Sequence, residues 1–196
     1  QGDPPIIGGG ILAGVTEVAK SPYLLGVCLF MALFTATSTV LYFEQAESVK
    51  NAFAGSAERT RVFAFIDLAV STLTIAVQVF LAGRIMKRFG VVVALTVLPA
   101  VTIAGFGLLA AAPTVVLLVG FQIVRRTSDY AVTRPAREVL YTVVTREQKY
   151  KAKNFIDTVV YRGGDAASGW LYNGLARGLG LDVATIALLC VPLGLA

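Results

Sequence analysis

The sequence contains no histidine and only two cysteines, Cys28 and Cys190, each within an apolar run. Zinc and iron sites are built from clusters of imidazole, thiolate and carboxylate groups, so we expect no metal site and no cofactor. The same scarcity leaves no histidine base to activate a nucleophile, and we therefore expect no catalytic residue and no enzyme. The alternative is an integral-membrane enzyme that uses Asp129 and Asp165 as two facing carboxylates.

Charged residues are also scarce. Of the 196 residues, 15% are charged and 56% are hydrophobic, and the mean hydropathy is +0.74, whereas about a quarter of an ordinary globular domain is charged. Uncharged runs at 22–43 and 91–112 are each about 20 residues long, which is enough to cross a bilayer. These features predict an all-α integral membrane protein surrounded by a lipid bilayer.

The formal net charge of +5 raises the possibility of a nucleic-acid partner. Nucleic-acid binding requires basic residues exposed on one soluble face, whereas here the basic residues flank hydrophobic segments. We therefore expect no nucleic-acid partner, and we attribute the positive charge to membrane topology.

Hydrophobic segments joined by short connections predict six transmembrane helices, at 22–43, 62–82, 91–112, 114–134, 154–176 and 183–196. We accordingly divide the chain into a cytoplasmic linker, 1–21, and a six-helix transmembrane region, 22–196. The last helix is expected to be truncated, because the final apolar run is slightly short for a full crossing.

Lys and Arg are unevenly distributed among the connections. If every predicted helix crosses the membrane, segments 1–21, 83–90 and 145–153 lie on one side and carry eight basic residues, against four on the other side. An excess of Lys and Arg marks the cytoplasmic side of a membrane protein. Both termini are therefore predicted to be cytoplasmic.

Polar side chains recur at helical spacing in four of the predicted helices. Asp67, Ser71, Thr74 and Gln78 form such a stripe in the second helix, and the first, fourth and fifth carry similar stripes. The third and sixth helices are nearly free of polar residues. This order describes a three-helix unit that occurs twice, as in secondary transporters whose polar helices line a central cavity. The substrate-binding or coupling residues that we predict in this cavity are Arg125, Arg126, Asp129, Asp165, Asp157, Tyr161, Gln122 and Asp67.

The fourth predicted helix contains several charges that must be paired or hydrated, because an ionised group at the bilayer centre costs at least about 2.5 to 3.5 kcal/mol. The spacing predicts that Arg125 and Arg126 pair with Asp129, at i, i+4 and i, i+3. Two arginines against one aspartate leave a positive charge that could bind an anion through paired N–H donors. The alternative is that these pairs only fix helix packing. We interpret Asp67, near the outer end of its helix, as a solvated residue.

The segment GRIMKRFG (83–90) resembles the G-x-x-x-D-R-x-G loop of the major facilitator superfamily, with Gly83, Arg88 and Gly90 at motif positions and Lys87 in place of the aspartate. The resemblance implies the C-terminal six-helix half of a major facilitator fold. Such a half works by alternating access together with an N-terminal six-helix half, which is absent from this chain and is the partner that the resemblance implies.

The segment 134–165 resembles the ATP/ADP exchange transporters of plastids and intracellular bacteria and their uncharacterised bacterial relatives. The shared pattern is Pro135, Arg137 and Glu138, then a Lys-rich linker, then Ile156 and Asp157; Arg134 stands where that family commonly has an acidic residue. The resemblance implies a transporter of the bacterial cytoplasmic (inner) membrane that exchanges nucleotides or other organic anions. We expect a cytoplasmic gate or loop formed by Gly83, Arg88, Gly90, Arg134, Arg137 and Glu138.

Two further functions stay open from the sequence. One is proton-coupled transport of another small solute, with Asp129 or Asp165 as the proton carrier. The other is a non-transporting membrane sensor or scaffold, although a scaffold would not need polar stripes on four of six helices. Glu138 cannot face the adjacent Arg137 on a helix, so its partner is expected on another helix or in the linker.

The predicted topology can be tested with the changes Lys149→Cys and Asn51→Cys, each made singly in a cysteine-free background. Because position 149 lies in the basic linker, we expect a membrane-impermeant thiol reagent applied to intact cells to label position 51 and not position 149. Labelling after the cells are opened serves as the control for reactivity. Labelling of position 149 alone in intact cells would show that the orientation is reversed.

Overall fold

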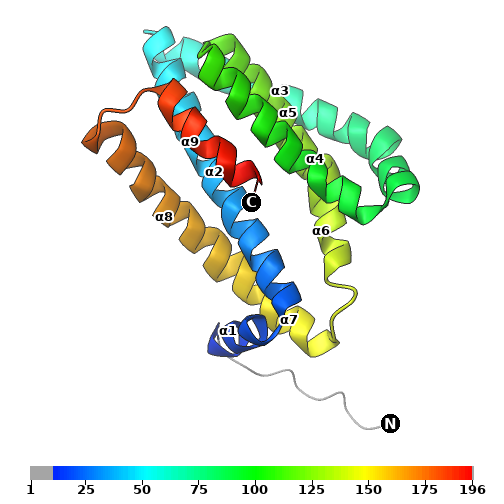
Figure 1. Ribbon diagram of the computed structural model, residues 1–196. Helices are drawn as coiled ribbons and strands as arrows, with labels where there is room; N and C mark the ends of the chain where they lie inside the picture. The colour runs from blue at the N-terminus through cyan, green and yellow to red at the C-terminus, as the bar shows by residue number, and fades with distance from the viewer. Residues whose placement is uncertain (1–10, 196) are drawn as a thin grey trace, which may run out of the picture.

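The computed structural model describes the backbone of residues 11–195 and, within this range, the side chains of all residues except 11–13, 147, 177, 183 and 191–195. Every regular element in the described part is a helix, and no strand occurs there (Figure 1). The α-helices are α1 (Ile11–Lys20), α2 (Pro22–Ala52), α3 (Ser56–Val77), α4 (Gly83–Ala111), α5 (Val115–Ser128), α6 (Arg134–Leu140), α7 (Arg146–Phe155), α8 (Tyr161–Asn173) and α9 (Val183–Leu195). Four π-helical turns continue them: η1 (Gln78–Ala82), η2 (Asp129–Thr133), η3 (Ile156–Val160) and η4 (Gly174–Gly178).

The predicted all-α class is confirmed, and each segment predicted to span the membrane coincides with a helical stretch. Two stretches, Pro22–Ala52 and Ser56–Ala111, are long and apolar enough to cross a membrane, judged by length and composition. The division of the chain into two three-helix repeats of a half-transporter stays a prediction.

Polar caps fix where several helices begin. Ser21 caps α2 and Thr114 caps α5, each accepting a hydrogen bond from a backbone N–H in the first turn. At α7, the Thr145 hydroxyl accepts from the Gln148 N–H and the Gln148 side chain accepts from the Thr145 N–H, which is a complete capping box. These side chains satisfy N–H groups that have no partner inside a helix.

The predicted loop 83–90 is shorter than expected. Gly83 and Arg88 lie in helix, and only Gly90 leaves it, with φ +83° and ψ 170°. Few residues other than glycine tolerate a positive φ, so this one residue changes the direction of the chain between the parts of α4 before and after it. The expectation of a loop through all eight residues is wrong, because the helical hydrogen bonds continue as far as Phe89.

The segment predicted as a cytoplasmic linker contains helix α1, whereas residues 1–10 lie outside the described part. α1 packs against α7, and the two helices lie next to each other at the lower end of Figure 1. A Cβ atom at Gly14 would lie 2.6 Å from the Phe155 Cβ and 2.8 Å from the Lys151 carbonyl oxygen. Glycine therefore permits the close approach of the two helices.

The helices with polar stripes and the nearly apolar ones pack in different ways. α2 runs beside α8, and α3 packs on α5, whereas the apolar helices α4 and α9 pack extensively on each other (Figure 1). A core cluster joins α2, α4, α5, α8 and α9, and within it the Phe106 and Phe121 rings meet edge to face at 5.2 Å. This packing leaves the polar faces of α2, α3, α5 and α8 for the cavity described below.

Gly105 and Gly107 on α4 provide a matched test of the contact between α4 and α5. A Cβ atom at Gly105 would lie 2.1 Å from ring carbons of Phe121, whereas one at Gly107 would meet nothing within 4 Å. We expect Gly105→Ala to lower the free energy of unfolding by about 1 to 3 kcal/mol, because the buried ring must move. Gly107→Ala should be neutral or stabilise by up to about 1 kcal/mol. Thermal unfolding in detergent measures both, and equal melting temperatures would contradict the packing described here.

Candidate functional site

A polar cavity of about 830 Å³ lies between α2, α3, α5, η2, α6 and α8. The helices predicted to carry polar stripes line it, and α4 and α9 contribute no lining residue among their described side chains. Seven of the eight predicted binding or coupling residues lie on its wall, namely Gln122, Arg125, Arg126, Asp129, Tyr161, Asp165 and Asp67. Asp157 lies in η3, outside the lining. The amphipathic pattern therefore located the cavity, although the roles of these residues stay predictions.

Arg126 pairs with Asp67 and so joins α5 to α3. The Arg126 Nη1 atom lies 2.7 Å from Asp67 Oδ1, with the two side chains 30% and 64% exposed. The predicted pair of Arg126 with Asp129 is wrong, and Asp67 is not simply solvated. Spacing within one helix cannot reveal a partner on another helix. Here Asp67 on α3 lies close enough to pair with Arg126 in place of Asp129.

Asp129 pairs instead with Arg134, five residues later in the chain. Its Oδ2 atom accepts from Arg134 Nε at 3.1 Å, and the Asp129 side chain is 5% exposed against 48% for Arg134. The two residues flank the π-helical turn η2, in which the Arg134 N–H donates to the Asp129 carbonyl. A π turn places residues i and i+5 on one face, a relation that regular helical spacing does not produce.

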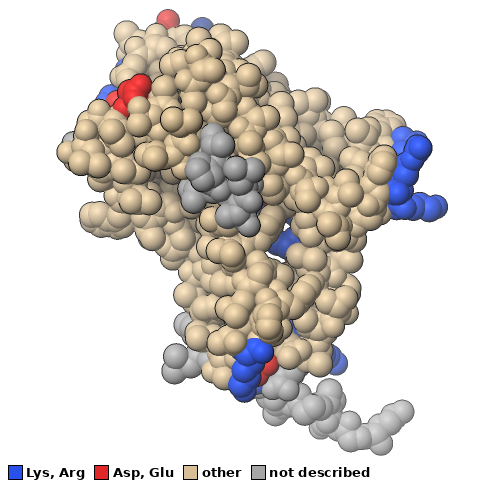
Figure 2. Space-filling view, in the orientation of Figure 1, with Lys and Arg blue, Asp and Glu red and all other residues tan. Residues whose placement is uncertain are grey.

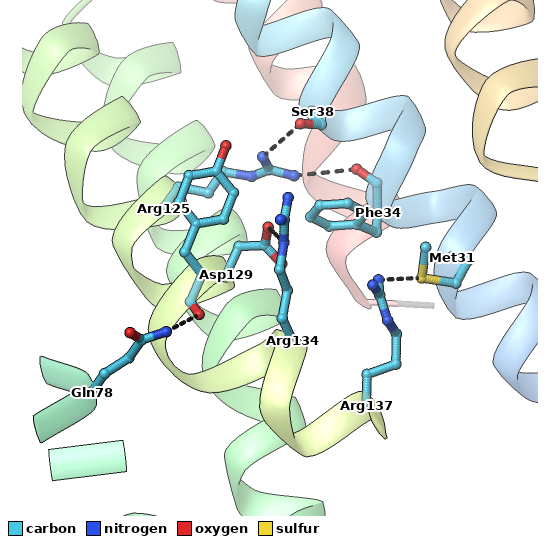
Figure 3. Close-up of polar contacts among 9 residues, drawn as sticks. Met31, Phe34, Ser38, Gln78, Arg125, Asp129, Arg134 and Arg137 are labelled. Carbon is cyan, nitrogen blue, oxygen red and sulfur yellow. Dashed lines mark hydrogen bonds and ion pairs between the residues drawn. The ribbon is translucent and has the colours of Figure 1, made fainter. Parts of the chain in front are cut away.

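Tyr130 lies between these two ion pairs. The guanidinium of Arg134 lies 4.2 Å from the centre of its ring and that of Arg126 lies 5.8 Å away. The Tyr130 carbonyl accepts a hydrogen bond from Gln78 Nε2 at 3.0 Å, which ties η2 to η1 (Figure 3). One aromatic ring therefore contacts both arginines that carry an aspartate partner.

Arg125 is 2% exposed and is held without a carboxylate. It donates to Thr37 Oγ1 (2.9 Å), Ser38 Oγ (3.2 Å) and the Phe34 carbonyl (3.2 Å) on α2, and to Thr102 Oγ1 (3.3 Å) on α4. The Phe34 ring lies 5.4 Å from the guanidinium carbon (Figure 3). Hydroxyl and carbonyl dipoles therefore satisfy this buried cation.

The predicted pair between Arg125 and Asp129 is wrong, since no carboxylate of the described residues lies within 4.0 Å of the guanidinium. The polar stripes did not predict the acceptors Thr37 and Thr102, because helical spacing shows which face a threonine lies on and not which charge of another helix it contacts.

The remaining charges of the cavity lie on α8. Asp165 accepts a hydrogen bond from Thr39 Oγ1 at 2.7 Å, which joins α8 to α2. Arg162 is exposed on the cavity wall and forms no ion pair with any side chain that the structure describes. The sequence-based prediction missed Arg162, although its position three residues before Asp165 places both on one helical face.

The cavity carries more positive than negative charge. Four arginines and three aspartates line it, namely Arg125, Arg126, Arg134, Arg162, Asp67, Asp129 and Asp165. Two of the aspartates are already paired with arginines. The cavity therefore has one positive charge in excess and can attract an anion.

The predicted gate residues belong to two helices, Gly83, Arg88 and Gly90 to α4 and Arg134, Arg137 and Glu138 to α6, and of these only Arg134 lines the cavity. Glu138 pairs with Lys153 of α7, with distances of 2.8 and 2.7 Å to its two oxygens, which confirms the expectation of a partner on another helix or in the linker. Arg137 Nη1 contacts Met31 Sδ at 2.8 Å. Lys153 also lies over the ring of Tyr141, and burial raises the pKa of the Tyr141 hydroxyl above its ordinary value, so the hydroxyl stays protonated.

No group of three His, Cys, Asp or Glu side chains that could hold a metal ion occurs in the described part of the chain. The cavity is instead lined by guanidinium, carboxylate, hydroxyl and aromatic groups. Such groups can bind an organic ion through hydrogen bonds and stacking.

Comparison with known proteins finds transporters. The ADP,ATP carrier protein 1 of Chlamydia muridarum (strain MoPn / Nigg) is 23% identical over 194 residues, covering 89% of this chain and 37% of the relative. The chain is similar to ADP,ATP carriers. The protein of the same name from Chlamydia trachomatis serovar D is 24% identical over 176 residues, covering 80% of this chain and 33% of the relative.

The chain thus spans about a third of the length of these curated relatives. No protein-family model matches the chain, and no solved structure matches it. The distant similarity to ADP,ATP carriers supports a transporter-like relationship and agrees with a protein that is not an enzyme.

The pairing of Asp129 with Arg134 predicts a specific pattern of stabilities. Arg134→Gln should lower the free energy of unfolding by about 1 to 3 kcal/mol, because it leaves the buried Asp129 carboxylate without its partner. Adding Asp129→Asn should restore most of the loss, whereas adding Asp129→Asn to Arg125→Gln should not. Denaturant or thermal unfolding in detergent measures these differences.

The exposed pair of Asp67 and Arg126 is the matched control for this cycle. Its double neutralisation should cost less than about 1 kcal/mol, because solvent screens exposed ion pairs. Additive losses for Asp129 and Arg134 would show that the two side chains are not coupled.

Proposed function

We propose that this chain is part of a secondary membrane transporter that binds an organic anion in the polar cavity, with a nucleotide as the first candidate. The observation that carries the proposal is the excess positive charge of the cavity, together with Arg162, which is free of an ion-pair partner among the described residues. A guanidinium presents several N–H donors in one plane and binds carboxylate or phosphate through two of them.

The dimensions and lining of the cavity support this proposal. Its volume of about 830 Å³ lies within the range of about 300 to 1,000 Å³ that is usual for small-molecule sites. Aromatic rings, including those of Phe34, Tyr42 and Tyr161, lie on the same wall as the arginines. A ligand with a ring system and a charged group would find partners for both.

The relatives support the choice of nucleotide. Both are named ADP,ATP carrier proteins, and our proposal extends nucleotide exchange to this chain. Since the chain spans about a third of their length, we propose that a second six-helix half supplies the other wall of the cavity. The two halves would then expose the cavity to one side of the membrane and then to the other.

The surface charge supports an orientation with both termini in the cytoplasm of a bacterium and the helices in its inner membrane. Figure 2 shows Lys and Arg side chains gathered where α4 begins, at the right-hand edge, and at the lower end over α1 and α7. The connections at 53–55, 112–114 and 179–182 lie toward the opposite end of the helices (Figure 1). An excess of basic residues at one end is what cytoplasmic connections carry.

Counterflow in proteoliposomes containing the full-length protein tests the proposal. Vesicles preloaded with ATP, ADP, inorganic phosphate or a neutral solute are supplied with labelled nucleotide outside. We expect accumulation that depends on internal nucleotide and falls at least about tenfold in Arg162→Gln, since a lost charge-assisted contact is worth about 1.5 to 3 kcal/mol.

The matched control is Arg84→Gln, which removes an exposed arginine outside the cavity lining. This variant should accumulate nucleotide as the wild type does. Vesicles that ignore every anion and accumulate a neutral solute would contradict the proposal. Absence of any uptake by correctly folded protein would favour a sensor or scaffold instead.

A further inference from the structure

Glu44 is a fully buried carboxyl group that lies outside the polar cavity. Its neighbours in α2, Phe43 and Gln45, line the cavity, whereas Glu44 has no exposed surface and is not part of the lining. It follows Val40 and Leu41 at helical spacing, and both belong to the core cluster where α2, α8 and α9 meet. The carboxyl group therefore lies within an apolar helix junction.

Neither oxygen of Glu44 has a hydrogen-bond partner among the described residues. The titratable groups that face it are Glu47 on the same helix, Tyr172 on α8, Asp182 just before α9 and Cys190 on α9. Each of these is neutral or negatively charged, so none of them stabilises a carboxylate by its charge.

Asp182, which faces Glu44 from the start of α9, is held in place by hydrogen bonds. The backbone N–H of Thr185 donates to Asp182 Oδ1 at 3.3 Å, and the Thr185 hydroxyl donates to the same oxygen. These hydrogen bonds keep the pKa of Asp182 below its ordinary value, so this exposed residue stays ionised at neutral pH. A second negative charge at Glu44 would be repelled by it.

An ionised carboxylate in such a place would lose its hydration and gain no counter-ion among the described side chains, with the Tyr172 hydroxyl as the donor that faces it, and the loss of hydration is very costly. A carboxylic acid at the same place is neutral and costs far less. We propose that Glu44 is a proton-binding site of this protein, which holds a proton in the arrangement described here. When α8 or α9 moves away from α2 and admits water, the Glu44 O–H releases its proton to that water and the carboxylate becomes hydrated.

This assignment differs from a proton carrier in the polar cavity. Asp129 has Arg134 as counter-ion and Asp165 accepts a hydrogen bond from Thr39, whereas Glu44 forms no ion pair with any side chain that the structure describes. Glu44 lies seven residues after Thr37, about two turns further along the same side of α2, and the Thr37 hydroxyl accepts a hydrogen bond from Arg125. A movement of α2 therefore changes the surroundings of Glu44 and the cavity together. This link to transport rests on the proposed function, whereas the proton site itself does not.

Infrared difference spectroscopy of the full-length protein in lipid measures the proton directly. At neutral pH, the wild type should show the C=O stretch of a protonated carboxyl group, with its shift in D₂O, that is absent from Glu44→Gln and retained in Glu47→Gln. Glu47 is the matched control, because it lies on the same helix and is exposed. A wild-type spectrum without this Glu44 band at neutral pH would overturn the proposal.

Thermal stability provides a second readout. As pH rises above about 4.3, where glutamate in an unfolded chain ionises, the folded state holds a proton that the unfolded state has lost. The wild type should therefore lose stability relative to Glu44→Gln with rising pH. Glu44→Met, which removes the titrating group and keeps a side chain of similar length, should abolish the same pH dependence. Parallel pH profiles for the wild type and both variants would contradict proton binding.

Transport by proteoliposomes separates this proposal from the proposed function. Nucleotide uptake that responds to an imposed pH gradient in the wild type and in Glu47→Gln, but at least about tenfold less in Glu44→Gln, supports coupling through this site. Vesicles without nucleotide uptake, whose protein shows the Glu44 infrared band, would remove the proposed function and leave the proton site. Vesicles with nucleotide uptake, whose protein lacks the band, would remove the proton site and leave the proposed function.

Discussion

The burial of the Arg125 guanidinium is the constraint on which the rest of this structure depends. A cation that is 2% exposed must find acceptors within the protein, and here α2 supplies three of them and α4 supplies the fourth. The three helices must therefore approach one another at the level of Arg125. The edge-to-face contact of Phe106 and Phe121, made possible by Gly105, fixes α4 against α5 one turn before Arg125, and Val40 and Leu41 of α2 belong to the same core cluster. Polar and apolar contacts thus specify one arrangement of α2, α4 and α5.

Much of the site could be predicted from the sequence, because a helix with polar residues on one face must turn that face away from the apolar core. The polar stripe through Gln122, Arg125, Arg126 and Asp129 faces the cavity, and seven of the eight predicted residues line this cavity. The positions of the helices were also predictable, since an uncharged run of about 20 residues is typical of a membrane-spanning helix. What the stripes could not provide was the partner of each charge, since that depends on neighbouring helices.

Local departures from regular α-helical geometry explain two of the predictions that the structure contradicts. The π turn η2 brings Arg134 to Asp129, and no rule of three or four residues anticipates this pair. At Gly90, a single positive φ replaces the expected loop. Glu44 went unnoticed because it follows an apolar run and resembles the first residue outside the membrane. Its burial results from α8 and α9, which the chain reaches more than a hundred residues later.

The two ion pairs that share Tyr130 have a consequence for how tightly the cavity would hold the proposed anion. Asp67 and Asp129 pair with Arg126 and Arg134 as an anion from outside would. An anion that binds Arg126 or Arg134 must displace an aspartate, and its net gain at that contact is the difference between two similar interactions, whereas Arg162 can bind an anion without such a displacement. At these two arginines the proposed anion would gain little affinity, and the displaced aspartate would compete with it for the same guanidinium. The contacts that would bind the anion would therefore also favour its release.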